Sequence, residues 1–192
     1  MGWNTTNDNG TADGYVTNNA AGDAFIYFKE ESTKFYVEGY VATMSDTAYN
    51  NDGWPKFGLI IRNDKAASLF FVDGCNSYNN PYVGFVESIP QEPGQWNWGT
   101  ERVFYVNGLS YKNNSLNLNG NFAKLAILRD GETFYFFAND LLVYTANSLY
   151  DLGADDLCDI GFFAFQTQMV VKGHSLTTNE AVVNEKLASI NK

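Results

Sequence analysis

The segment from Phe122 to Thr145 constrains the fold of this chain more than any other. It reads FAKLAILRDGETFYFFANDLLVYT, in which Asp130-Gly131 and Asn139-Asp140 separate three apolar runs. Aromatic and β-branched residues favour strands, and Asp-Gly and Asn-Asp pairs favour tight reversals between neighbouring strands. The segment therefore predicts consecutive strands of one sheet, joined by two short turns.

The same pattern continues along most of the chain. Period-2 alternation bounded by turn residues predicts further strands, at Asp23 to Lys29, Lys34 to Met44, Lys56 to Asn63, Ser68 to Asp73, Tyr82 to Ser88, Arg102 to Asn107, Asp159 to Gln166 and Met169 to His174. Hydrophobic residues make up 45% of the 192 residues and aromatic residues 16%, which is enough to fill one core. We expect a single all-β domain.

Two kinds of strand indicate two packed sheets. In the strand from Lys34 to Met44, one face carries Phe35, Val37, Gly39 and Val41, and the other carries Tyr36, Glu38 and Tyr40. The runs Phe57 to Ile61 and Phe134 to Phe137 are apolar on both faces, which suits central strands that are covered on both sides. The predicted fold class is therefore an all-β antiparallel sandwich of two sheets.

The end of the chain carries the only helical pattern. One face of a helix between Thr178 and Ile190 would be marked roughly by Val182, Val183, Leu187 and Ile190. The pattern is short, so it favours an unpacked tail or a linker to another module over a docked helix. We place the sandwich domain at residues 1–176 and the tail, with a short helix as the alternative, at 177–192.

The charge balance excludes some partners. Asp and Glu total 22 against 12 Lys and Arg, a net charge of -10, which repels phosphate backbones and anionic membranes. We therefore expect no nucleic-acid partner. No stretch reaches the roughly 20 apolar residues of a membrane span, so we expect no membrane insertion. The acidity and the abundant Asn, Gly, Ser and Thr suggest an extracellular or cell-surface protein. The start Met1-Gly2-Trp3-Asn4 has no basic and apolar signal region, so we expect a piece of a longer, multidomain precursor.

The two cysteines leave the redox compartment open. Cys75 and Cys158 lie too far apart in the sequence for a metal knuckle. A disulfide between them and two unpaired thiols, with Cys158 buried, are equally compatible with the pattern.

Several strands together carry a resemblance to a known superfamily. The segments are KLAILRDG at Lys124 to Gly131, followed by TFYFFAND and LLVYT, IGFFAFQ at Ile160 to Gln166, and KFGLIIRN at Lys56 to Asn63. They resemble the concanavalin A-like lectins and glucanases, which include the laminin G-like jelly rolls. The resemblance covers roughly Asp23 to Ser175. It implies a jelly roll of two curved antiparallel sheets, with a concave face and edge loops that often bind glycans.

The catalytic signature of the glucanases in this superfamily does not occur in the sequence. Glycoside hydrolysis usually needs two carboxylates about 5 to 9 Å apart. The glucanases place them on one strand as Glu-x-Asp-x-x-Glu, whereas Glu30 and Glu31 are adjacent and Glu87 and Glu92 flank a Pro-bearing loop. His174 lies beside Ser175 without a G-x-S-x-G elbow, so a strand-end role is favoured over a hydrolase triad. A hydrolase remains the minority hypothesis, with carboxylates contributed by separate strands.

The loop Gln95-Trp96-Asn97-Trp98-Gly99 is the strongest candidate for ligand binding. In an extended segment Trp96 and Trp98 project to the same side, where their flat rings can stack on sugars while Gln95 and Asn97 bond hydroxyls. The alternative is that one Trp plugs a sheet edge. Trp54 precedes a central strand, which favours a core position for its side chain.

Other aromatic and charged residues are candidates for the rim of the same surface. Tyr78 and Tyr82 flank the Asn79-Asn80-Pro81 turn. Strand alternation allows Tyr36, Tyr40 and Arg62 to line a concave face. Each of these residues is common in strands and turns. Together they indicate a binding surface only if the fold brings their side chains to the same place.

Two acidic segments suggest a structural calcium ion. Asn7 to Asp13 reads NDNGTAD and Asp151 to Asp159 reads DLGADDLCD, so both offer the oxygen ligands that Ca²⁺ prefers. The candidate ligands are Asp8, Asp13, Asp155 and Asp156, and many jelly rolls of the resembling kind carry such an ion. Neither segment has EF-hand spacing, and solvated acidic loops are the alternative.

The leading functional hypothesis is a non-catalytic carbohydrate-binding module of a larger secreted or cell-surface bacterial protein. It would bind an oligo- or polysaccharide on its aromatic surface. The first alternative is a structural or adhesion module that recognises protein, and the second is a glycoside hydrolase.

Overall fold

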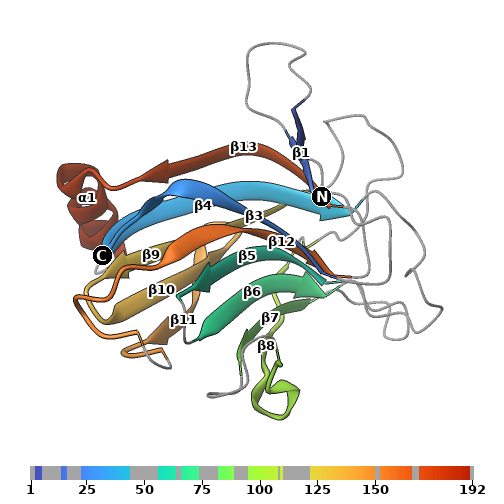
Figure 1. The fold of residues 1–192 in the computed structure, drawn as a ribbon, viewed down its shortest axis with the longest axis horizontal. Coiled ribbons are helices and arrows are strands. Elements are labelled where there is room, and N and C mark those ends of the chain that lie inside the picture. Colours follow the sequence, from blue (N-terminus) through green and yellow to red (C-terminus); the bar gives the residue numbers. More distant parts are fainter. Residues whose placement is uncertain are drawn as a thin grey trace.

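The fold was analysed in a computed structural model that describes residues 3–5, 14–16, 23–43, 56–63, 66–73, 82–88, 95–107, 109, 122–149, 152–165 and 169–190. Strands form two antiparallel sheets that pack face to face (Figure 1). This arrangement confirms the predicted antiparallel sandwich. Within the described ranges, no helix is long and apolar enough to cross a membrane.

The first sheet has seven strands in the order β1-β2-β13-β4-β9-β10-β11. Their bounds are Trp3–Thr5 for β1, Gly14–Val16 for β2, Met169–Thr177 for β13, Lys34–Thr43 for β4, Ala123–Asp130 for β9, Thr133–Ala138 for β10 and Leu141–Ala146 for β11.

The second sheet has six strands in the order β3-β12-β5-β6-β7-β8. Their bounds are Asp23–Glu31 for β3, Asp159–Phe165 for β12, Lys56–Arg62 for β5, Ala67–Asp73 for β6, Tyr82–Glu87 for β7 and Arg102–Phe104 for β8. A short 3-10 helix, η1, spans Trp98–Thr100 just before β8. Neighbouring strands along the chain often lie in different sheets, as a jelly roll requires.

The predicted reversals after β9 and β10 are present. Gly131 has φ +61, and Asn139 and Asp140 have φ 49 and 64, the left-handed region that Gly, Asn and Asp tolerate best. The Asn139 side-chain oxygen also accepts a hydrogen bond from the Lys124 backbone N–H at 3.0 Å. The sequence of the turns therefore sets the register of β9 with β10.

Aromatic side chains fill the space between the two sheets. Phe70 and Phe85 of the six-stranded sheet contact Phe136 of the other sheet, with ring centroids 5.2 and 4.8 Å apart. Gly58 lies at the centre of β5, where a Cβ atom would lie 2.3 Å from the Phe70 carbonyl oxygen. Close packing of backbone and rings thus explains why β5 is apolar on both faces and has a glycine in its middle.

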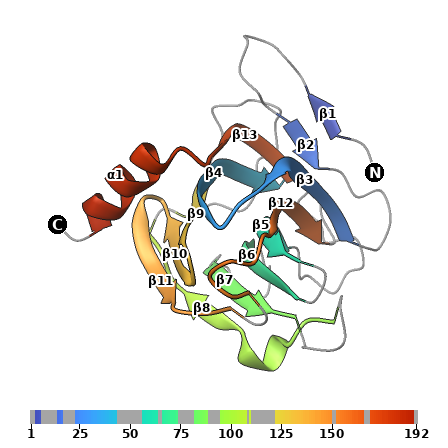
Figure 2. The same ribbon diagram turned by 60° about the vertical axis from the view of Figure 1, so that its left-hand side comes forward.

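A helix, α1, spans Glu180–Ile190 and packs on the outer face of the seven-stranded sheet (Figure 2). The Asn179 side-chain oxygen caps it by accepting a hydrogen bond from the Ala181 N–H at 3.0 Å. Val183 is fully buried in a cluster with Tyr36 and Leu128. The residues after β13 are therefore docked, in contrast to the unpacked tail that the sequence favours. The domain boundary at residue 176 stays a prediction.

Cys158 is a buried free thiol. The Arg129 guanidinium donates a hydrogen bond to its sulfur at 3.3 Å. Burial raises the pKa of Cys158 to about 11, although the positive charge of Arg129 opposes the shift. Cys75 lies outside the described residues.

Candidate functional site

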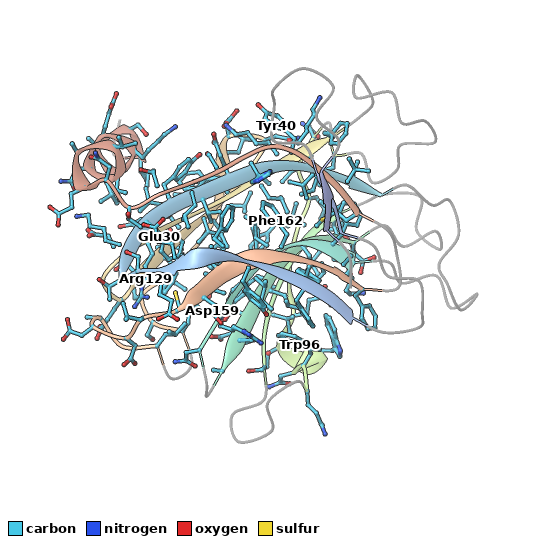
Figure 3. All side chains as sticks on the ribbon, turned by 45° about the horizontal axis from the view of Figure 1, so that its top comes forward. Glu30, Tyr40, Trp96, Arg129, Asp159 and Phe162 are labelled. Atoms are coloured by element: carbon cyan, nitrogen blue, oxygen red, sulfur yellow. The ribbon has the colours of Figure 1, made fainter. Side chains whose placement is uncertain are left out.

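The predicted ligand-binding residues divide between two faces of the molecule. Tyr36 and Tyr40 lie on the outer face of the seven-stranded sheet, whereas Trp96 and Tyr82 pack on the outer face of the six-stranded sheet. Figure 3 shows Tyr40 and Trp96 on opposite sides of the sandwich, with Phe162 between them. The convergence that the sequence analysis required is therefore absent for the two tyrosines of β4, because the sandwich core separates them from the Trp residues.

The two tyrosines of β4 have local roles. Tyr36 is 7% exposed beneath α1 and donates a hydrogen bond to a Glu38 carboxylate oxygen at 2.7 Å. Burial, with the negative charge of Glu38, raises the pKa of Tyr36. Tyr40 lies beside two ammonium groups, with Lys124 Nζ 5.8 Å and Lys172 Nζ 5.9 Å from the ring centroid. These contacts hold the helix and neighbouring strands together.

The outer face of the six-stranded sheet carries a second apolar cluster, which we call the outer cluster. Its buried members are Ile60, Leu69, Phe71, Val86 and Phe163, one or two from each central strand. Strand alternation directs these side chains away from the main core. Partly buried aromatic residues surround them, namely Phe25, Tyr27, Tyr82, Trp96 and Phe165. A mainly aromatic rim, with Ala67 as its one small member among the described residues, is the kind of outward surface that binds apolar ligand faces.

The loop before β8 folds over the outer cluster. Trp96 forms an isolated antiparallel bridge with Ser88 and packs on the cluster. The Trp98 ring meets Phe71 edge to face at 6.1 Å and is 38% exposed. Asn97 is half-buried and Gln95 is exposed. The two Trp residues thus lie over the same face, Trp96 mainly as packing and Trp98 with much of its ring open to solvent.

A buried polar row lies beside Trp98. Lys56, Asp73 and Tyr82 are register neighbours at one end of β5, β6 and β7. The Lys56 Nζ atom is 2.7 Å from a carboxylate oxygen of Asp73, and the Tyr82 hydroxyl donates to the same oxygen at 2.8 Å. Lys56 Nζ also lies 5.1 Å from the Trp98 ring centroid. The ion pair therefore supports the Trp98 ring from below.

Glu101 completes this end of the surface. Its Oε1 atom lies close to Gly84, where an added Cβ would be 2.9 Å from that oxygen and 2.4 Å from Phe71. Glycine at position 84 therefore makes room for the carboxyl group. Burial, the largest cause, and the negative charge of Asp73 raise the pKa of Glu101, while hydrogen bonding with Tyr82 and the charge of Lys56 oppose the shift.

Arg62 lies on the same sheet but at the opposite end of the surface. Lys56 and Arg62 are the first and last residues of β5, so roughly 20 Å separate their Cα atoms. The Arg62 guanidinium bonds Asp159 at 3.1 Å and stacks on Tyr27, whose ring centroid is 4.1 Å away. Burial raises the pKa of Tyr27 to about 12. The outer cluster therefore has a charged pair at each end.

The described part of the candidate calcium loops contains Asp155 and Asp156, both exposed. One carboxylate oxygen of Asp156 accepts a hydrogen bond from the Gly153 N–H at 2.8 Å. No group of three or more potential metal ligands occurs among the described residues. Asp8, Asp13, Tyr78 and Trp54 lie outside them, so calcium binding stays a prediction.

Sequence reasoning missed Lys56, Asp73 and Glu101. The alternation within β5 and β6 places Lys56 and Asp73 at strand ends, which is visible in the sequence. Their pairing depends on the register of the two strands, which is not. His174, which sequence reasoning considered, packs against the rings of Phe28 and Phe162 at 5.9 and 6.0 Å and has a packing role at the strand end.

Comparison with known proteins identifies a shared fold, although no protein-family model and no curated protein sequence matches the chain. Among solved structures, the carbohydrate binding module CBM66 from Bacillus subtilis is similar with a TM-score of 0.56 and 19% identity, over 92% of this chain and 91% of that one.

Two enzymes have similar folds. A mixed linkage glucan GH16 protein from Bacteroides ovatus has a TM-score of 0.55 and 12% identity, over 91% of this chain and 85% of its own. The alginate lyase Aly36B has a TM-score of 0.56 and 10% identity, over 88% and 81%. Binding modules and enzymes thus share the architecture, and the chain has the concanavalin A-like jelly-roll fold that its strand pattern predicts.

Proposed function

We propose that the chain is a non-catalytic carbohydrate-binding module, part of a larger secreted or cell-surface bacterial protein. It would bind an oligo- or polysaccharide on the outer face of the six-stranded sheet. The observation that carries the proposal is the position of Trp98. Its ring is fixed by Phe71 on one side and by the Lys56 ammonium on another, and still leaves 38% of the residue exposed.

The chemistry of this surface suits a sugar ring. A pyranose or furanose presents C–H groups on one face, which stack on an indole, and hydroxyls around its edge. Polar groups near Trp98 include the Asn97 amide and the Tyr82 hydroxyl. A ring fixed before the ligand arrives costs little conformational entropy on binding. The similarity of the fold to a carbohydrate-binding module supports the proposal.

The test is the substitution Trp98→Ala, with binding measured on a glycan array and by affinity gels that contain soluble polysaccharides. Loss of one exposed stacking partner should weaken binding at least tenfold, on the order of 1.4 kcal/mol or more. The control is Leu142→Ala, which truncates an exposed apolar residue on β11 of the other sheet. Equal binding by wild type and Trp98→Ala would contradict the proposal.

A glycoside hydrolase is the second candidate, favoured by one contact. Tyr82 bridges two carboxyl groups, because its hydroxyl bonds Asp73 and lies within hydrogen-bonding reach of Glu101. Two carboxyl groups that share one phenol oxygen lie near each other, as the carboxyl pair of a glycosidase must. A raised pKa also suits a general acid.

The same contacts argue for binding over catalysis. Asp73 is completely buried and bonded to Lys56 and Tyr82, so its carboxylate has no open side for attack on a sugar. A reducing-end assay on every polysaccharide that binds decides between the two functions. We expect no release of reducing ends. Hydrolysis that Glu101→Gln abolishes would establish the enzyme instead.

We also propose a structural calcium ion, on the basis of the two acidic segments around Asp8 to Asp13 and Asp155 to Asp156. The measurement is the melting temperature with millimolar CaCl₂ and with EGTA. Binding of the ion to the folded state should raise the melting temperature in calcium. Identical melting curves in both buffers would remove the ion from the proposal.

A further inference from the structure

We propose that Glu101 is a specificity-determining residue that makes the site select uncharged glycans over carboxylated ones. The inference rests on the proposed glycan binding at Trp98 and adds the chemical class of the ligand. The reason is the arrangement of charges on this face. Lys56 and Arg62 are already in ion pairs, and the carboxyl group of Glu101 lies beside the exposed Trp98 indole.

Two cations on this face whose side chains the structure describes, Lys56 and Arg62, have anionic partners within the sheet. Lys56 is bonded to Asp73 at 2.7 Å, and both side chains are buried. Arg62 is bonded to Asp159 at 3.1 Å at the far end of the surface. A ligand carboxylate would therefore have to break an existing ion pair before it gained a salt bridge, which costs desolvation and an orphaned partner charge.

Glu101 supplies the remaining charge near Trp98. Tyr82 has one hydroxyl proton, and Asp73 accepts it at 2.8 Å. The Oε1 atom of Glu101 has no hydrogen-bond partner among the described residues. This oxygen lies against Gly84 and the edge of Phe71, the same ring that supports Trp98. A sugar stacked on Trp98 would thus lie close to the Glu101 carboxyl group.

Chemical complementarity follows from this geometry. A sugar hydroxyl brings no charge toward the Glu101 carboxyl group, whereas a sugar carboxylate places a like charge near it in a partly buried site. The net charge of -10 adds repulsion of the same sign over the whole surface. Uncharged glycans are therefore favoured, by about 10- to 100-fold over carboxylated analogues.

Protonation should weaken this selection. The groups that face Glu101 are Asp73, Lys56 and Tyr82, from β6, β5 and β7. Burial and Asp73 raise the pKa of Glu101 above its ordinary value, whereas the carboxyl groups of uronic and carboxymethyl acids have lower pKa values. Selection should therefore weaken as the pH falls through the raised pKa of Glu101, while the carboxylated ligands remain ionised.

The experiment uses matched pairs of polymers that differ in charge. The pairs are hydroxyethyl and carboxymethyl forms of cellulose, of dextran and of β-1,3-glucan, and methyl-esterified and de-esterified homogalacturonan. The measured quantity is the ratio of affinities within each pair, at low and moderate salt. Wild type should prefer the uncharged member at least tenfold.

Two isosteric variants separate local from global charge. Glu101→Gln and Glu132→Gln change the net charge equally, but Glu132 is exposed in the turn between β9 and β10. Glu101→Gln should reduce the ratio toward one and remove its pH dependence, and Glu132→Gln should leave the ratio as in wild type. Thermal unfolding of both variants verifies that they fold.

The outcomes distinguish the inference from the function it rests on. If no uncharged polymer binds, the proposed glycan binding fails. If uncharged polymers bind and the carboxylated members bind as well or better, the selectivity inference alone fails. The same holds if Glu101→Gln and Glu132→Gln lower the ratio equally, because the effect would then come from the net charge.

Discussion

Arg129 shows how one residue can connect distant parts of the chain. Its guanidinium is completely buried and donates hydrogen bonds to the carbonyl oxygens of Ser32, Gly131 and Gly153 at 3.0, 2.9 and 2.8 Å. It also lies 5.1 Å from the Phe134 ring centroid. The planar fork of arginine matches three acceptors from three separate loops, which a lysine cannot do.

Replacement of Arg129 by Met should therefore destabilise the protein strongly. The substitution leaves three partly buried carbonyl groups without their donor, and we expect a loss of at least about 3 kcal/mol in the free energy of unfolding. Urea unfolding followed by circular dichroism measures it. Arg102→Met is the control, because Arg102 is exposed on β8, and it should cost less than about 1 kcal/mol. Similar losses for both variants would contradict the proposed role.

Cys158 predicts a pH dependence of stability. Its pKa in the folded state is raised above its ordinary value to about 11, mainly by burial. The folded state therefore favours the neutral thiol. The resulting stability is fully present below pH 9 and is lost as the pH rises toward 11, at up to about 1.4 kcal/mol per pH unit.

Urea unfolding of wild type and Cys158→Ala between pH 8 and 11 tests this prediction. Tyr27, whose pKa is raised to about 12, adds a decline above pH 10 in both proteins. The difference between wild type and Cys158→Ala in the free energy of unfolding should therefore change mainly between pH 9 and 11. Parallel curves throughout this range would show that the Cys158 thiol does not titrate as expected.

At the scale of elements, the helix α1 depends on a few contacts with the seven-stranded sheet. Val183 is fully buried against Tyr36 and Leu128, and Leu187 packs against the same cluster. The Lys186 ammonium lies 4.7 Å from the Tyr36 ring centroid. A helix of 11 residues is marginal in isolation, so packing on the sheet supplies most of its stability.

Substitutions at two adjacent valines should separate packing from helix propensity. Val183→Ala removes a buried side chain and should cost about 1.5 to 3 kcal/mol, whereas Val182→Ala, at a residue that is 39% exposed, should change stability by less than about 0.5 kcal/mol. Thermal unfolding measures both, and hydrogen exchange of α1 shows whether the helix separates locally. Equal effects would mean that the helix does not dock through Val183.

At the scale of the whole molecule, the two outer faces have different roles. Helix α1 and two tyrosines cover part of the seven-stranded sheet, while the outer cluster and Trp98 lie on the six-stranded sheet. The core between them isolates one face from the other (Figure 3). A substitution on one face should leave ligand binding on the other unchanged.

The variant Tyr40→Ala tests this separation. It removes an exposed aromatic ring comparable to Trp98 in exposure, but from β4 of the opposite sheet. For any polysaccharide that wild type binds and Trp98→Ala does not, the affinity of Tyr40→Ala should remain within about twofold of wild type. A tenfold loss in Tyr40→Ala would place the ligand on the seven-stranded sheet.

The sequence by itself determined most of the strands, the turns and the class of fold, although it did not predict β1 and β2. Period-2 alternation is a local property, and the left-handed φ of Gly131, Asn139 and Asp140 follows from the residues at those turns. The resemblance that the same segments carry implies the jelly roll. The loop around Trp96 and Trp98 was also identified from its composition.

Only the tertiary structure decided which residues share a face. Tyr36 and Arg62 have the same kind of alternation in their strands, yet the strands belong to different sheets. The partnership of Lys56, Asp73 and Tyr82 depends on register, and the place of Glu101 beside them depends on Gly84 and the fold of η1. Docking of α1 likewise depends on an apolar patch formed by three strands. Such contacts join residues distant in sequence, and no local pattern specifies them.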